Sequence, residues 1–195
     1  MLPGHREGGI MPKQLASGAT VPATNTQSIV AAINAVAGIH QFDPAAIAGV
    51  VHMESVWKTT CVTGQYIGLT QVGPDFVHYL KLTKNEFLAL SAPQQIVAYG
   101  KWLDYYHFNN QLAAHGIDLN SHPLARQAAF LQAMQFSPNG QDWKTAFAND
   151  DYSVPSTHSK QAQALGDTSI EDMESYYGGI FTHNPPVYQQ AMADV

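Results

Sequence analysis

The sequence is poor in cysteine, in charged residues and in long apolar runs. Its one cysteine, Cys61, cannot form an internal disulfide, so the fold must be stabilised by packing. Charged residues make up 12% of the chain and the formal net charge is -6, which excludes a basic stripe for nucleic acid and a polybasic membrane anchor. The longest apolar stretch, near residues 47–53, is interrupted by Gly49 and His52 and is far shorter than the ~20 residues that cross a bilayer.

What the sequence does contain is enough apolar material for one folded core. Hydrophobic residues make up 45% of the 195 residues, a composition typical of a globular domain. Residues 1–24 are rich in small residues and proline, so we expect a flexible leader there and a single domain over residues 25–195. The first twenty residues lack the apolar segment of a secretory signal.

Hydrophobic periodicity predicts a mainly α fold. The best-marked helix has Asp43 as N-cap, Pro44 at its first position and an end near residues 57–58. Residues 59–70 mix β-branched residues with glycines and favour a loop or a short hairpin. The other expected helices cover residues 26–38, a turn at Pro74, 83–90 and 93–108 (each opened by a capping box), 123–136, and more weakly 140–148, 160–165, 170–176 and 186–192.

Glu54 is the candidate catalytic residue. It lies on the apolar helix that begins at Pro44, where burial disfavours the charged form of a carboxyl group. A raised carboxyl pKa is what a general acid working near neutral pH requires. Helix position alone also fits a glutamate on a solvated face, or one held in a structural hydrogen bond.

The residues after Glu54 form a recognisable pattern. Glu54-Ser55 is followed by Thr63 and then by the turn Gly68-Leu69-Thr70-Gln71. In this the chain resembles the lysozyme-like lytic transglycosylases, the family that includes soluble lytic transglycosylase and goose-type lysozyme. In that family a Glu-Ser pair ending a helix precedes a Gly-Leu-Met-Gln type turn. Thr70 stands in place of the methionine, and Thr63 in place of a frequent serine.

The resemblance covers roughly residues 27–145 and includes the helix segment 96–103. It departs from the family at the Tyr-Asn-Ala-Gly-Pro segment, whose tyrosine and asparagine face the cleaved sugar, because the nearest match is Met134-Gln135-Phe136-Ser137-Pro138. Tyr188 is a candidate for the late tyrosine of the family. The resemblance implies a lysozyme-like helical domain with a small loop or hairpin element, and a cleft between the Glu54 helix, the turn at 68–74 and the helix ending near Phe136.

The activity that the resemblance implies is cleavage of peptidoglycan between N-acetylmuramic acid and N-acetylglucosamine. Glu54 would protonate the glycosidic oxygen and then act as a base. In a transglycosylase the sugar's own hydroxyl closes a 1,6-anhydro ring, whereas a hydrolase usually needs a second carboxylate. Asp75 is the nearest downstream carboxylate, and its position beside Pro74 fits a helix start equally well. The sequence leaves lyase and hydrolase open.

Several residues near these motifs are expected to bind the sugar. Glycine lets the backbone approach a ligand closely, an amide offers both a donor and an acceptor to an N-acetyl group, and aromatic rings stack on sugar faces. The same side chains also serve as loop or core packing in many proteins. The substrate-binding candidates are Ser55, Thr63, Tyr66, Gly68, Leu69, Gln71, Tyr99, Gln135, Phe136 and Tyr188.

No metal or cofactor is expected. The nine histidines are scattered, and the His52-Met53-Glu54 triplet lacks the paired cysteines of a zinc deaminase. Cys61 shows no activating neighbour for a nucleophile.

The alternatives are a domain that binds glycan without cutting it, as part of a phage tail or secretion machine, and a chitinase on the same fold. For the enzyme we expect a secretion-system effector acting in the periplasm, with an immunity protein as partner, or a phage lysin.

Overall fold

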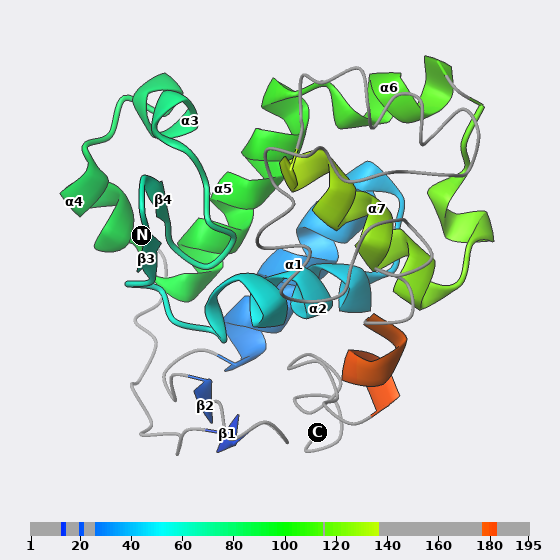
Figure 1. Ribbon diagram of the computed structural model, residues 1–195, viewed down its shortest axis with the longest axis horizontal. Helices are drawn as coiled ribbons and strands as arrows, with labels where there is room; N and C mark the ends of the chain where they lie inside the picture. Colours follow the sequence, from blue (N-terminus) through cyan, green and yellow to red (C-terminus); the bar gives the residue numbers. More distant parts are fainter. Residues whose placement is uncertain (1–12, 15–19, 22–25, 115, 137–176, 183–195) are drawn as a thin grey trace, which may run out of the picture.

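The computed structural model describes residues 13–14, 20–21, 26–114, 116–136 and 177–182, and this part of the chain is mainly helical, as predicted (Figure 1). The weaker helices expected at 140–148, 160–165, 170–176 and 186–192 lie outside these residues. Within the expected leader, strands β1 (Lys13–Gln14) and β2 (Thr20–Val21) form an antiparallel pair. None of the described helices is long and apolar enough to cross a membrane.

Helix α2 (Pro44–Ser55) lies at the centre of the core. The Asp43 side chain accepts a hydrogen bond from the Ala45 N–H at 2.8 Å, which confirms the predicted N-cap. The helix ends two residues earlier than predicted because Val56 and Trp57 adopt left-handed backbone conformations, with φ of 49° and 64°. Such φ values are unfavourable for side chains other than glycine, above all for β-branched valine. Burial of the Trp57 ring, which is 1% exposed, helps to offset this strain.

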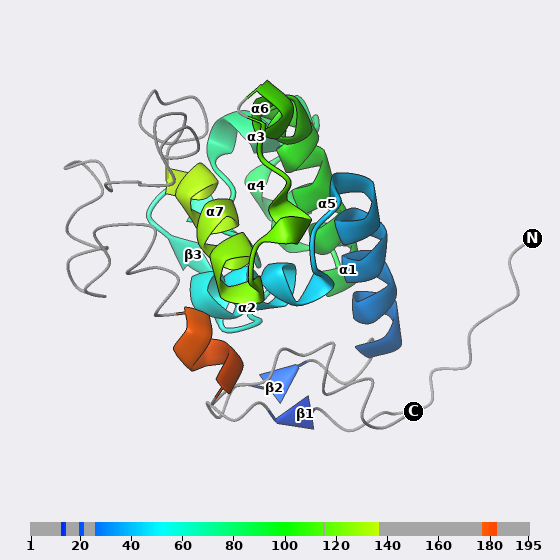
Figure 2. The same cartoon turned by 90° about the vertical axis from the view of Figure 1, so that its right-hand side faces the viewer.

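Two helices pack against α2, and a third packs on the first of them. Helix α1 (Thr26–His40) continues two residues past the predicted stop at Gly38 and packs on α2 and on α5 (Ala92–Tyr105), while α7 (Leu124–Phe136) covers another side of α2 (Figures 1 and 2). The crossing of α1 and α5 is close, since a Cβ added at Gly100 would lie 2.9 Å from Cγ2 of Val36. These contacts bury α2 along almost its whole length.

A short hairpin follows α2, as the composition of residues 59–70 predicted. Strands β3 (Val62–Thr63) and β4 (Tyr66–Ile67) pair antiparallel, and the chain then turns so that Ile67 bridges to Val72. Gln95 of α5 supports this turn from below. Its Oε1 accepts the Leu69 N–H at 2.8 Å, and its Nε2 donates to backbone carbonyls of the neighbouring loops.

Short helices complete the described fold: α3 (Pro74–Tyr79), α4 (Lys84–Leu88), α6 (Phe108–Ala114) and the 3-10 turn η2 (Leu119–Ser121). Both predicted capping boxes are present, with the Thr83 N–H donating to Glu86 at 2.7 Å and the Ser91 N–H donating to Gln94 at 2.8 Å. The helix predicted over 93–108 is two helices, because the backbone breaks at His107, where φ is 56°.

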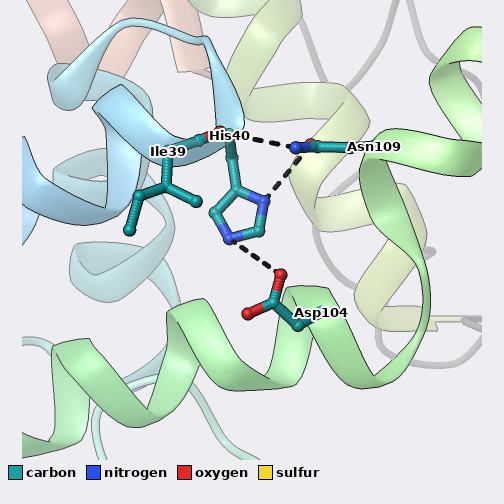
Figure 3. A network of polar contacts seen from close by, with 4 residues as sticks. All are labelled: Ile39, His40, Asp104 and Asn109. Atoms are coloured by element: carbon teal, nitrogen blue, oxygen red, sulfur yellow. Dashed lines mark hydrogen bonds and ion pairs between the residues drawn. The ribbon is translucent and has the colours of Figure 1, made fainter.

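A polar cluster fastens the end of α1 to α5 and α6 (Figure 3). Nδ1 of the buried His40 lies 3.2 Å from Oδ1 of Asn109, whose Nδ2 donates to the Ile39 carbonyl at 3.4 Å. Nε2 of His40 points toward Asp104, 3.8 Å away. Because its partners come from two other helices, this histidine fixes the packing of helices rather than a ligand site.

Candidate active site

Glu54 lies in the last turn of α2, immediately before the strained turn at Val56 and Trp57. Its side chain is partly buried, and burial raises the pKa of the carboxyl group to about 7, while a hydrogen bond from Gln132 opposes the rise. A carboxyl group with a pKa near neutrality holds a proton at physiological pH and can release it. This is the electrostatic property that the sequence predicted for Glu54.

Gln132 and Tyr177 form a chain of hydrogen bonds that ends on Glu54. Nε2 of Gln132, on α7, donates to Oε1 of Glu54 at 2.5 Å. The Tyr177 hydroxyl donates to Oε1 of Gln132 at 2.7 Å and also lies 3.2 Å from Sδ of Met53. Gln132 and Tyr177 are 1% and 0% exposed, so water does not compete for these bonds.

A short helix over residues 177–182 delivers Tyr177 to this chain. Both views place this helix, drawn in orange, beside the lower end of α7 and next to α2 (Figures 1 and 2). It packs against α2 at Gly49, where an added Cβ would lie 2.8 Å from the Phe181 ring and 3.3 Å from the Tyr177 ring. The absence of a side chain at Gly49 therefore lets the helix approach closely enough for Tyr177 to reach Gln132.

Tyr99 of α5 interacts electrostatically with the Glu54 carboxyl group. Its pKa is raised well above the ordinary value, mainly by burial and in part by the charge of Glu54, while the Gln135 amide opposes the rise. No well-aligned hydrogen bond joins Tyr99 to Gln135, and the Tyr99 hydroxyl has no partner among the described residues. Tyr99 is 0% exposed and stacks on Trp102, so in this structure it is part of the core rather than a ring open to a sugar.

A cavity of about 280 Å³ opens beside this cluster, between the hairpin turn, α3, α5 and α7. Its wall combines aromatic rings with amide and carboxylate groups. Glu54 does not itself line the cavity. Gln135 links the two, because it lines the cavity and also affects the pKa of Tyr99. The charge of Glu54 affects the pKa of the same tyrosine. The lining includes Tyr66, Gln71, Asp75, Trp102, Tyr106 and Gln135.

Two amides in the cavity wall have unsatisfied atoms. Gln71 adopts a left-handed φ of 47°, and its Nε2 donates to the Gly68 carbonyl at 2.7 Å, which leaves its buried Oε1 without a partner in the described structure. Nε2 of Gln135 is also buried and has no partner there. Buried polar atoms normally find partners, and the Gln135 amide acts on the Tyr99 hydroxyl, which is itself buried without a well-aligned partner.

The remaining predicted residues have other positions. Ser55 is buried and its hydroxyl donates to the Val51 carbonyl at 3.1 Å, so it stabilises its own helix. Leu69 is in the core, and Gly68 contributes backbone geometry with φ of 80°. Thr63 is exposed on β3, away from these contacts. Phe136 ends α7 but its side chain lies outside the described residues, as does Tyr188.

The sequence does not predict the two residues of the hydrogen-bonded chain that ends on Glu54. Gln132 is one of three glutamines in the helix expected over 123–136, and no feature of the sequence distinguishes it from Gln127 and Gln135. Tyr177 precedes Gly178-Gly179 in a polar segment, where no local pattern indicates burial. It is a late tyrosine of the chain, as Tyr188 is, and the structure brings it to Glu54 through Gln132.

Comparisons of the chain with models of known protein families, with characterised proteins and with solved structures found no match. Functional inference therefore depends on the motifs and on the geometry of the site. Within the described residues, no three His, Cys, Asp or Glu side chains come together in a way that could hold a metal ion.

Proposed function

We propose that this protein cleaves the glycan strands of peptidoglycan between N-acetylmuramic acid and N-acetylglucosamine, with Glu54 as general acid in a lysozyme-like domain. The observation that carries the proposal is the Glu54 carboxyl group at the end of the core helix, whose pKa burial raises to about 7. The Glu54-Ser55 pair, the Gly68-Leu69-Thr70-Gln71 turn and the hairpin between them support the family resemblance.

In the proposed reaction, the protonated Glu54 donates its proton to the glycosidic oxygen as the bond to the anomeric carbon breaks. The resulting carboxylate accepts the hydrogen bond from Gln132 and is then placed to take a proton from the attacking hydroxyl group. If that hydroxyl belongs to the muramic acid, a 1,6-anhydro product forms. If water attacks instead, a second carboxylate is needed, and Asp75 in the cavity wall is the candidate.

The cavity supports a sugar carrying an N-acetyl group. Tyr66, Trp102 and Tyr106 offer aromatic surface for a sugar face. A small movement of each side chain would bring the buried acceptor Oε1 of Gln71 to an acetamido N–H, and the buried donor Nε2 of Gln135 to an acetamido carbonyl. Saturating both atoms with one ligand group would remove two buried unsatisfied polar atoms at once.

The test is digestion of purified peptidoglycan by the wild type, by Glu54→Gln and by the control Glu86→Gln, with mass spectrometry of the released muropeptides. Glu86 is the other glutamate among the described residues and lies exposed in a capping box, which glutamine preserves. We expect the wild type and the control to release muropeptides and Glu54→Gln to release none. Anhydro products identify a lytic transglycosylase and reducing ends a muramidase; equal release by Glu54→Gln refutes the role of Glu54.

The same experiment separates the other functions. Met134 and Gln135 stand where the family carries the tyrosine and asparagine that face the sugar, which favours a module that binds the sacculus without cutting it. Binding by all variants without release supports that function. A chitinase is recognised by cleavage of chitin oligomers in preference to peptidoglycan.

The delivery route remains part of the proposal: a secretion-system effector with a cognate immunity protein, or a phage-borne lysin or virion component.

A further inference from the structure

We infer that Gln132 and Tyr177 are positioning residues that hold the Glu54 carboxyl group in both of its protonation states. That these residues serve catalysis rests on the proposed function, in which Glu54 is the general acid. The inference rests on the structure for its geometry, which is a continuous chain of short hydrogen bonds from Tyr177 through Gln132 to Glu54.

The direction of the chain follows from the groups involved. A carboxylate can only accept hydrogen bonds, so it requires the NH₂ side of the Gln132 amide. This orientation turns the Gln132 carbonyl toward Tyr177, whose hydroxyl donates to it at 2.7 Å. The tyrosine therefore stabilises the amide in the orientation that suits the charged Glu54.

The protonated state needs the opposite orientation. A protonated carboxyl group has an O–H to donate, and the Gln132 carbonyl becomes its acceptor when the amide turns by half a rotation about its terminal bond. The NH₂ group then faces Tyr177, whose hydroxyl oxygen accepts. Because a hydroxyl both donates and accepts, Tyr177 satisfies the amide in either orientation.

Three segments of the chain come together to form these hydrogen bonds. Glu54, Gln132 and Tyr177 come from three separate segments, and the close approach at Gly49 brings the third one in. The other titratable group that faces Glu54 in the described structure is Tyr99 of α5, which remains neutral because burial raises its pKa. Burial and the Gln132 bond are thus the two effects on Glu54, and only the second is removed by changing Gln132 or Tyr177.

The test measures the titration of Glu54 directly, without turnover. The chain has five glutamates, so the side-chain carboxyl carbons of ¹³C-labelled protein can be followed by NMR, with Glu54→Gln assigning the Glu54 signal. We expect Gln132→Leu to raise the titration midpoint of Glu54 by about one pH unit, because the hydrogen bond from the amide to the carboxylate is charge-assisted and stronger than the bond to the protonated carboxyl group. Tyr177→Phe frees the amide to turn and should raise the midpoint by a smaller amount.

The matched control is Gln127→Leu. Gln127 is also a buried glutamine on α7, but it accepts from the Asp43 N–H at 2.6 Å and donates to the His122 carbonyl, away from Glu54. It should lower stability and leave the titration midpoint unchanged. An unchanged midpoint in Gln132→Leu overturns the inference, as does an equal shift in Gln127→Leu. Because the readout is a titration, shifted midpoints in a protein that releases no muropeptides would refute the enzyme and support the positioning.

Discussion

Replacing Glu54 by glutamine should make the protein more stable at neutral and higher pH while abolishing its proposed activity. Folding raises the pKa of this carboxyl group from 4.5 to about 7, so the folded state binds the proton more tightly than the unfolded state. The contribution of Glu54 to the free energy of unfolding is therefore greatest below pH 4.5, falls between pH 4.5 and 7, and stays low above that. A tenfold change in proton affinity is worth about 1.4 kcal/mol, so the total loss is about 3 kcal/mol.

The assay is urea unfolding, followed by tryptophan fluorescence at several pH values from 4 to 8, for the wild type and Glu54→Gln. Glutamine does not titrate and can still accept the hydrogen bond from Gln132, so the other titrating groups cancel in the difference between the two proteins. The difference should grow in favour of the variant by about 3 kcal/mol between pH 4.5 and 8. Constant urea dependence across the series checks that the unfolded states are comparable.

Glu86→Gln provides a control of opposite sign. The hydrogen bond from the Thr83 backbone lowers the pKa of the exposed Glu86, so the wild type gains stability as the pH rises through that range and loses it as the pH falls. Relative to the wild type, the Glu86 variant should lose stability as the pH rises toward 4.5, below the range in which Glu54 titrates, and the difference should stay constant at higher pH. A Glu54 difference that stays constant within about 0.5 kcal/mol from pH 4 to 8 would refute the argument that burial disfavours the charged form.

Three further outcomes follow from the same geometry. Muropeptide release at low substrate concentration should fall about tenfold per pH unit above about pH 7, as Glu54 loses its proton, which a pH series of digestions measures. Gly68→Ala should lower the free energy of unfolding in urea by more than ~2 kcal/mol, because φ is 80° and the new Cβ would lie 2.7 Å from Gln95 and from a neighbouring ring. Gly64→Ala, where φ is 62° and the added Cβ has no neighbour, should lower it by about 1 kcal/mol. Gln95→Leu should cost about 3 kcal/mol in the same assay, since it leaves the buried Leu69 N–H without a partner.

The parts of the fold that the sequence predicted are those whose signals are local. Asp43 and Pro44 mark the start of α2 because a helix cap joins residues two positions apart. The two capping boxes join residues three positions apart. The hairpin was indicated by composition alone. The end of α2 was placed two residues too late, because the left-handed turn at Val56 and Trp57 is imposed by tertiary packing and goes against the preference of those residues.

The candidate site was predictable only in part, for the same reason. Glu54 and Gln71 lie in a motif that can be read along the chain, and the structure places Gln71 in the wall of the cavity near Gln135. The partners of Glu54 are 78 positions away at Gln132 and a further 45 at Tyr177. No periodicity or spacing relates residues at such distances, so their contact appears only when α2, α7 and the 177–182 helix are packed together.

The buried polar atoms without a partner gather in one region of the described structure, which supports a functional site there independently of any resemblance. Elsewhere in the described chain Asp43 and Thr83 cap their helices, and the amides of Gln95 and Gln127 are hydrogen-bonded. The four buried side-chain atoms without a partner among the described residues all belong to this region. They lie on Trp57 in the turn after α2, on Gln71 and Gln135 in the cavity wall, and on Tyr99, whose pKa the charge of Glu54 affects.

A raised carboxyl pKa and buried polar atoms without a partner both lower stability. Packing alone would not concentrate them around one carboxyl group, whereas a site that must hold a proton and a polar ligand requires them there. If Glu54 serves catalysis at the expense of stability, Glu54→Gln must be both more stable than the wild type at neutral pH and inactive.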